Sequence, residues 1–288
     1  MNMFLSRFLM DIRKKALSVG INKFKNFPQY TLNGCVKDVA DITALLKQFL
    51  GFDSSEIITL TDEQATKANI MTALKDMVQQ AKAGNCNYLF MHLSTHGTQV
   101  PDQDQDEPDH ADEAFVPHDI EQQGDTWHPD HIISDDELRT LFSQLPTENV
   151  MLEAFLDTCH SGTGLRAMDL LSDRKVRWIP PPSLDAFREL EGLQVHGLRE
   201  GLMEGDMKNH VLFTGCRSDQ TSADAHIGDS YNGAFTYYMC KVIKESQNGS
   251  TRTQDINKLR DSLKDSFSQI PQLECSPQFK EKPLGFSL

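Results

Sequence analysis

The sequence lacks closely spaced cysteine pairs, long apolar runs and an excess of positive charge. None of the six cysteines belongs to a CxxC pair, so neither a zinc site nor a disulfide framework is indicated, and we expect reduced thiols in a cytoplasmic protein. No stretch approaches the roughly 20 apolar residues that a membrane span needs. The chain has 28 basic and 42 acidic residues, which gives a net charge of −14. This charge disfavours binding to nucleic acid and anionic membranes and favours binding to cations or basic peptides.

Short apolar runs of strand length alternate with amphipathic helical patterns along most of the chain. Such alternation predicts a parallel sheet covered by helices on both faces. We expect one α/β domain over residues 15–288, preceded by a short arm over residues 1–14. The expected strands cover residues 16–21, 57–60, 88–94, 150–157 and 210–216, and the expected helices cover 36–49, 70–81, 134–143, 234–245 and 253–267.

Two long segments, residues 101–129 and 163–209, show no sustained periodicity. Long irregular segments inside a compact domain are usually functional loops or linkers. The second contains three consecutive prolines at 180–182 and several arginines. We interpret residues 163–209 as a flexible loop that can be proteolytically processed.

A histidine and a cysteine each follow one of the predicted strands. His96 and Gly97 come directly after the run at 88–94, and Cys159 follows the run at 150–157. A cysteine attacks as the thiolate, and a nearby imidazole can take and return its proton near neutral pH. The backbone N–H groups of Gly97 and Cys159 could face a developing oxyanion. This pattern indicates nucleophilic catalysis by Cys159 with His96 as the base.

The residues alone leave other interpretations open. A lone cysteine is more often an inert, buried, small apolar residue than a nucleophile. His92 and His160 compete with His96 for the role of base, although His92 lies within a strand and His160 is adjacent to Cys159, where extended neighbours point apart.

Several motifs occur in the order and spacing of one peptidase family. They are GINKFKN, GCVKD, STHGTQ, DEPDHADEAFVPHD, DTCHSG, CRSDQTSADA and GAFTYYM. In these motifs the chain resembles the metacaspases, without a regulatory prodomain. The resemblance implies a caspase-like three-layer α/β/α sandwich with a mainly parallel central sheet. It also implies a monomeric cysteine endopeptidase with Cys159 and His96 as its dyad and no organic cofactor.

The resemblance also assigns a specificity pocket. Its members are Asp38 and Asp157, with Cys35 and Ser94 as walls, and two carboxylates suit an arginine or lysine side chain before the cleaved bond. The expected substrates are therefore polypeptides with basic residues. Two alternatives stay open: a caspase-like peptidase with a different specificity, and a catalytically silent caspase-like interaction module.

Calcium activation and self-processing are further expectations. Calcium-dependent metacaspases bind the ion through aspartates that match Asp112, Asp135 and Asp136, although Asp135 and Asp136 could instead simply begin a helix, whose dipole favours acids there. An enzyme that cuts after basic residues can also cut its own loop. Among the basic residues of 163–209, Arg174 and Lys175 are the expected cleavage sites.

Overall fold

The computed structural model describes residues 12–101, 111–159, 174–183, 209–217 and 220–287. Most of the predicted processing loop and of the predicted N-terminal arm lies outside these ranges. Among the described residues, no helix is long and apolar enough to cross a membrane.

A six-stranded sheet runs through the centre of the molecule in the order β14-β11-β9-β3-β1-β2. All neighbouring strands are parallel except β14, which pairs antiparallel with β11 at one edge. The central strands are buried along their whole length, as expected of parallel strands covered on both faces. The strands are β1 (Lys14–Gly20), β2 (Ile57–Thr61), β3 (Tyr88–Ser94), β9 (Met151–Asp157), β11 (His210–Thr214) and β14 (Gln272–Cys275).

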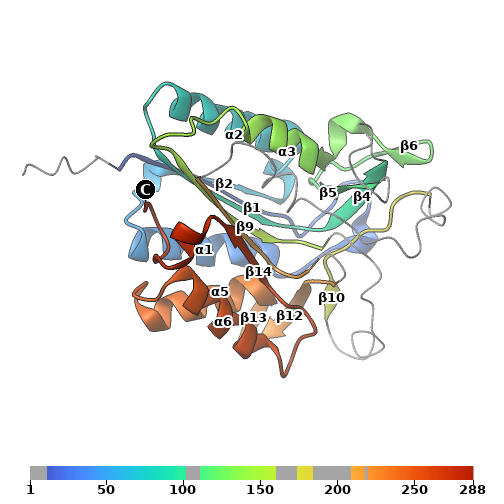
Figure 1. Cartoon of the computed structure of the whole chain (residues 1–288). Coiled ribbons are helices and arrows are strands. Elements are labelled where there is room, and N and C mark those ends of the chain that lie inside the picture. Colours follow the sequence, from blue (N-terminus) through green and yellow to red (C-terminus); the bar gives the residue numbers. More distant parts are fainter. Residues whose placement is uncertain (1–11, 102–110, 160–173, 184–208, 218–219, 288) are drawn as a thin grey trace, which may run out of the picture.

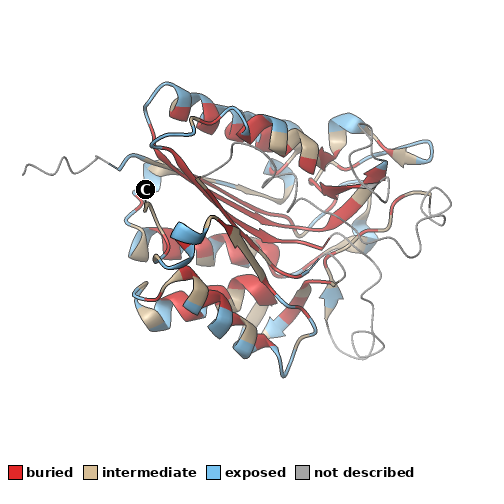
Figure 2. Ribbon diagram, viewed as in Figure 1, coloured by how far each residue is buried: buried red, intermediate tan, exposed pale blue. Residues whose placement is uncertain are grey.

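Helices cover both faces of this sheet and divide the core into two parts (Figure 1). One face packs against α2 (Lys67–Lys82) and α3 (Asp135–Phe142), and the other packs against α1 (Cys35–Phe49), α5 (Ala234–Ser246) and α6 (Arg252–Leu263). Figure 2 shows buried residues lining the sheet and the helix sides that face it. The predicted α/β/α sandwich with a mainly parallel sheet is confirmed.

Short strands outside the central sheet form the parts that the sequence pattern did not reveal. Residues 101–129 were predicted to be irregular, but they contain several strands of two to five residues, which are too short to show a sustained period. The additional elements are β4 (Gly97–Pro101), β5 (Ala111–Phe115), β6 (Gln122–Gln123), β7 (Thr126–Trp127), β8 (Ile133–Ser134), β10 (Lys175–Val176), β12 (Ala223–Ile227), β13 (Ser230–Gly233) and α7 (Pro277–Lys280). Single 3-10 turns occupy Pro28–Tyr30, Ser54–Glu56, Asp62–Gln64 and Pro129–His131.

The strand order places two chemically reactive residues at one edge of the sheet. β3 and β9 are parallel neighbours, and Ser94 pairs with Asp157 at their carboxyl ends. His96 and Cys159 each follow two residues later, so they occupy equivalent positions beyond strands that are about 4.8 Å apart. β2 lies on one side of β1 and β3 lies on the other, so the order in which strands are added to the sheet reverses here. In open α/β sheets, the crevice at such a reversal holds the reactive groups.

Candidate active site

The carbonyl group of Tyr30 determines which ring nitrogen of His96 carries a proton. Nε2 of His96 lies 2.7 Å from this oxygen. A carbonyl oxygen can only accept, so Nε2 donates and the neutral ring keeps its lone pair on Nδ1. Nδ1 is buried and has no hydrogen-bond partner within the part of the chain that the structure describes. It is therefore the atom of His96 that can take a proton from a nucleophile.

Burial favours the neutral form of the His96 imidazole. Burial lowers its pKa to about 3, opposed by the hydrogen bond to Tyr30 and assisted by the positive charge of Arg177. The ring packs against Phe24, with 5.0 Å between the ring centroids. A neutral imidazole with a fixed orientation is the form that a general base requires.

Cys159 is fully buried, and within the described ranges its thiol has two hydrogen bonds, both with Ser222. The N–H group of Ser222 donates to Sγ, and Sγ lies 3.2 Å from the Ser222 carbonyl oxygen, to which the thiol donates. Among the described residues no hydrogen bond joins the side chains of Cys159 and His96. The topology thus brings the two residues to one edge of the sheet, while the thiol proton is directed to Ser222.

The backbone N–H groups of Gly97 and Cys159 converge on a single oxygen atom. Both donate to the carbonyl oxygen of Arg177, at 2.9 Å from Gly97 and 3.3 Å from Cys159. These are the two donors that the sequence predicts for an oxyanion. Two converging backbone donors next to a thiol are the arrangement that stabilises negative charge on a carbonyl under attack.

The chain segment that carries this carbonyl crosses the site as an extended strand. Within it, β10 pairs antiparallel with β12, and the N–H of Arg177 donates to the Ser222 carbonyl at 3.1 Å. On the other side of Arg177, the N–H of Ile179 donates to the Gly97 carbonyl at 3.0 Å. Main-chain pairing on both sides of one carbonyl group is how peptides bind along an exposed sheet edge.

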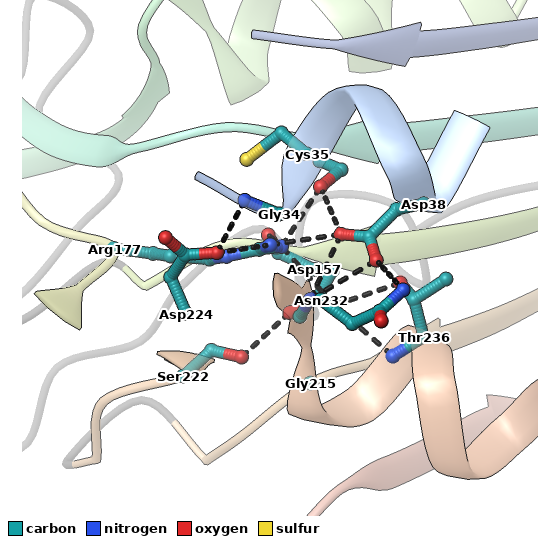
Figure 3. A network of polar contacts seen from close by, with 12 residues as sticks. Gly34, Cys35, Asp38, Asp157, Arg177, Gly215, Ser222, Asp224, Asn232 and Thr236 are labelled. Atoms are coloured by element: carbon teal, nitrogen blue, oxygen red, sulfur yellow. Dashed lines mark hydrogen bonds and ion pairs between the residues drawn. The ribbon is translucent and has the colours of Figure 1, made fainter. Parts of the chain in front are cut away.

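The guanidinium group of Arg177 fills a closed acidic pocket (Figure 3). The side chain is fully buried and faces three carboxylates, those of Asp38 at 2.8 Å, Asp157 at 3.1 Å and Asp224 at 3.6 Å. Its Nη1 also donates to the hydroxyl of Ser94 at 2.8 Å. Asp38 and Asp157 thus meet in one pocket, as the sequence predicts, and Asp224 is an additional member.

Hydrogen bonds hold the pocket carboxylates in place. Asp157 accepts from the Ser222 hydroxyl at 2.6 Å and from both the N–H and the hydroxyl of Thr236, at 3.0 and 2.7 Å. Gly233 forms the adjacent wall, because a Cβ atom there would lie 2.1 Å from Oδ2 of Asp157. Only a glycine permits this close approach.

The other pocket members differ in charge. Burial raises the pKa of Asp38 to about 6, although the charge of Arg177 counteracts part of the shift. Burial also raises the pKa of the Cys35 thiol, so Cys35 is an uncharged wall. The hydroxyl of Ser94 donates to Asp38 at 2.7 Å. Asp38 therefore loses its negative charge as the pH falls through about 6.

The three predicted calcium ligands lie near the β5–β8–α3 region. Asp112 and Asp135 are buried, whereas Asp136 forms an ion pair with Arg139. No group of three or more potential metal-ligating side chains comes together within the described ranges. We derive no catalytic step through calcium, and calcium activation stays a prediction.

The two predicted processing residues lie outside the acidic pocket. The guanidinium of Arg174 stacks on the ring of Phe267, and Lys175 is exposed and reaches the carbonyl oxygen of Thr31. The sequence interpretation did not single out Arg177, nor Tyr30, whose contribution is a backbone carbonyl. Ser222 and Asp224 belong to the CRSDQTSADA motif, so that motif could have indicated them.

Known proteins share sequence features and the fold of this chain. A model of the caspase domain matches residues 13–282. The chain is 32% identical to metacaspase-1 of Sclerotinia sclerotiorum and to metacaspase-1A of Aspergillus fumigatus over 92% of its length, and it spans 66% and 69% of these relatives. A protein of Geobacter sulfurreducens has a similar fold, with a TM-score of 0.65 at 23% identity over 94% of this chain and 97% of that one. Caspase-1 from Spodoptera frugiperda has a TM-score of 0.58 at 11% identity, over 94% and 88% of the two chains.

Proposed function

The chain belongs to the caspase-domain family of cysteine peptidases, and we propose that it is an endopeptidase that cleaves after arginine and, less readily, after lysine. One observation carries this proposal. Arg177 places its side chain in the acidic pocket and its carbonyl oxygen between the N–H groups of Gly97 and Cys159. The chain's own segment is therefore bound as a peptide substrate would be, with arginine before the bond to be cleaved.

The first half of the proposed reaction is acyl transfer to Cys159. Nδ1 of His96 takes the thiol proton, and the thiolate sulfur bonds to the carbonyl carbon of the residue in the pocket. The N–H groups of Gly97 and Cys159 stabilise the oxyanion. When the C–N bond breaks, His96 returns the proton to the leaving amine.

The second half of the proposed reaction is hydrolysis of the thioester. Water attacks the thioester carbonyl, with His96 again as the base, and releases the carboxylic acid and the free thiol.

The pocket favours arginine over lysine because its acceptors surround two different nitrogen atoms. Nη1 of Arg177 faces Asp157 and Ser94, while Nη2 faces Asp38 and Asp224. A lysine ammonium is a single point charge and cannot contact all of these groups at once. An aspartate side chain would be repelled by the three buried carboxylates.

Peptides that differ only before the cleaved bond test this proposal. The expected order of kcat/KM is arginine, then lysine, with no measurable cleavage after aspartate. The preference for arginine should weaken as the pH falls through about 6, because protonation of Asp38 removes one of its attractive charges. Fluorogenic peptides assayed from pH 5 to 8 provide the measurement. Equal rates on the arginine and aspartate peptides would contradict the proposal.

We also propose that the protein cuts its own chain between Arg177 and Trp178. The Arg177 carbonyl already lies at the oxyanion donors, so this bond is presented to Cys159 at high effective concentration. In the described state the Cys159 thiol donates its proton to the Ser222 carbonyl. The Arg177–Trp178 bond therefore stays uncut until the thiol proton moves to His96. Neither Arg174 nor Lys175 presents its carbonyl group in this way.

Intact-mass measurement of the purified protein tests self-cleavage. We expect two fragments that meet between residues 177 and 178, and both should be absent from Cys159→Ala and Arg177→Gln proteins. Lys175→Gln is a matched control on the same strand, because its exposed side chain lies outside the pocket, and it should still be cut. Incubations with and without calcium would also test the predicted activation by that ion. Fragments that end at other basic residues, or an uncut wild-type chain under all conditions, would exclude cleavage at this bond.

The monomeric state and the cytoplasmic location expected from the sequence stay predictions.

A further inference from the structure

A second cationic side chain of the bound segment contacts a separate site, outside the acidic pocket. Arg174, three residues before Arg177, places its guanidinium carbon 4.4 Å from the centroid of the Phe267 ring. The same guanidinium donates to the carbonyl oxygen of Ser266. A π face and a carbonyl oxygen both present negative charge, so this pair of groups suits a planar cation.

A cleft runs alongside the segment that occupies the active site. Besides residues 174–176 of that segment, it is lined by Thr221, Ser222, Ala223, Phe267, Ser268 and Gln269. Successive side chains of an extended strand point to opposite sides. Arg174 accordingly points to the Phe267 side, while Lys175 points to the opposite side and reaches Thr31.

Hydrogen bonds fix the distance between this cleft and the catalytic centre. Gln269 donates to the Gly215 carbonyl at 2.9 Å and accepts from the N–H of Ala223 at 3.0 Å. Gln220 donates to the Ser268 carbonyl at 3.0 Å. Phe267 is therefore held against the same loop whose Ser222 contacts both Cys159 and the N–H of Arg177. When a substrate places the arginine of its cleaved bond in the acidic pocket, the side chain three positions earlier would contact the Phe267 ring.

We propose that the Phe267 ring, at the wall of this cleft, and the Ser266 carbonyl form a second specificity subsite, which selects arginine three positions before the arginine at the cleaved bond. The preferred substrates are then peptides of the pattern Arg-x-x-Arg. This inference rests on the proposed endopeptidase function. The chain's own sequence from Arg174 to Arg177 fits the pattern, which is how the segment occupies both subsites at once.

The test uses a parent variant, Arg174→Ala with Arg177→Gln, which removes the chain's own two cations from the subsites. Three fluorogenic peptides are compared: Arg-Lys-Val-Arg, Ala-Lys-Val-Arg and Arg-Ala-Val-Arg. We expect kcat/KM for the first to exceed that for the second by about 3- to 30-fold, the range that a partly desolvated cation–π contact supports. The first and third should agree within about 2-fold, because the position of Lys175 is exposed.

Adding Phe267→Leu to the parent keeps an apolar side chain but removes the π face, and it should reduce the first ratio to about 2-fold or less. Lys264→Ala is the control, since Lys264 is exposed and forms an ion pair with Asp261, and the ratio should persist. Equal rates on the first two peptides, or a ratio that Phe267→Leu leaves unchanged, would overturn the second subsite.

Absence of all turnover would contradict the proposed function instead. In that event, calorimetry measures the Kd of the same peptides for the parent variant that also carries Cys159→Ala. The Kd of Ala-Lys-Val-Arg should then exceed that of Arg-Lys-Val-Arg by the same factor as expected for kcat/KM. Equal Kd values, or no binding of either peptide, would overturn the second subsite independently of catalysis.

Discussion

Replacement of Cys159 by alanine is expected to abolish peptide hydrolysis, because it removes the sulfur atom that lies beside the two oxyanion donors, one of which is the N–H group of Cys159 itself. Cys35 lies near Arg177, but burial raises the pKa of its thiol and it is a wall of the pocket, not a neighbour of the carbonyl group. Cys240→Ala is the matched control, since this cysteine lies on α5, away from the oxyanion donors.

Replacement of His96 by alanine is expected to lower kcat by about 100- to 10,000-fold, the usual contribution of a general base. The thiol would lose its proton acceptor, whereas the oxyanion donors are backbone groups and would remain. His226→Ala should retain the parental rate, because the His226 side chain is exposed on β12. Steady-state kinetics on an arginine peptide provide the measurement, with Arg177→Gln as the parent so that the pocket is open to substrate. Full activity of the His96→Ala protein would mean that another group serves as the base.

The sequence predicted this dyad because its members follow two fully buried strands. β3 and β9 are mostly apolar runs, so their ends are visible without a structure, and His96 and Cys159 each stand two residues beyond such an end. Parallel strands align their carboxyl ends at one edge of the sheet. The sequence does not show that Ser94 pairs with Asp157. This pairing, which places His96 and Cys159 at the same height beyond their strands, is a property of the folded sheet alone.

The occupant of the pocket could not be predicted in the same way. Arg177 follows a strand of only two residues, β10, which forms by pairing with β12 far along the chain. So short a strand has no period for a sequence pattern to show. Among several arginines in one aperiodic segment, composition alone does not indicate which of them reaches three buried carboxylates.

The orientation of His96 was also beyond prediction from the sequence, for a different reason. Its partner is the backbone carbonyl of Tyr30, a group that every residue type has. Asp224, by contrast, is a recognisable side chain, but its backbone partners Asn33 and Gly34 come from the opposite end of the chain. Its membership of the pocket depends on that long-range contact.

Replacement of Asp157 by asparagine is expected to lower kcat/KM on arginine peptides by roughly 30-fold to several thousand-fold. Removing one partner of a buried charge pair costs about 2–5 kcal/mol, and each 1.4 kcal/mol is about tenfold. Asp157 is fully buried, and it also accepts hydrogen bonds from Ser222 and Thr236. An asparagine keeps one accepting oxygen but turns an NH₂ group towards the other donors, so part of these hydrogen bonds would be lost together with the charge.

Two rates measured on the same variant separate a defect in recognition from a defect in folding: cleavage of an arginine peptide, and alkylation of Cys159 by a small neutral reagent. A loss of folded protein would lower both rates equally. A loss of the pocket charge should lower the cleavage rate more than the alkylation rate, because the neutral reagent does not need the pocket. Asp41→Asn is the matched control, because Asp41 lies on the same helix as Asp38 and contacts Asn232 and Lys37 but not Arg177. Its kcat/KM should stay within about 2-fold of the parent. If Asp157→Asn matches Asp41→Asn on arginine peptides while both proteins keep the same Tm, Asp157 does not recognise the basic side chain, and the pocket's selectivity must come from Asp38 and Asp224.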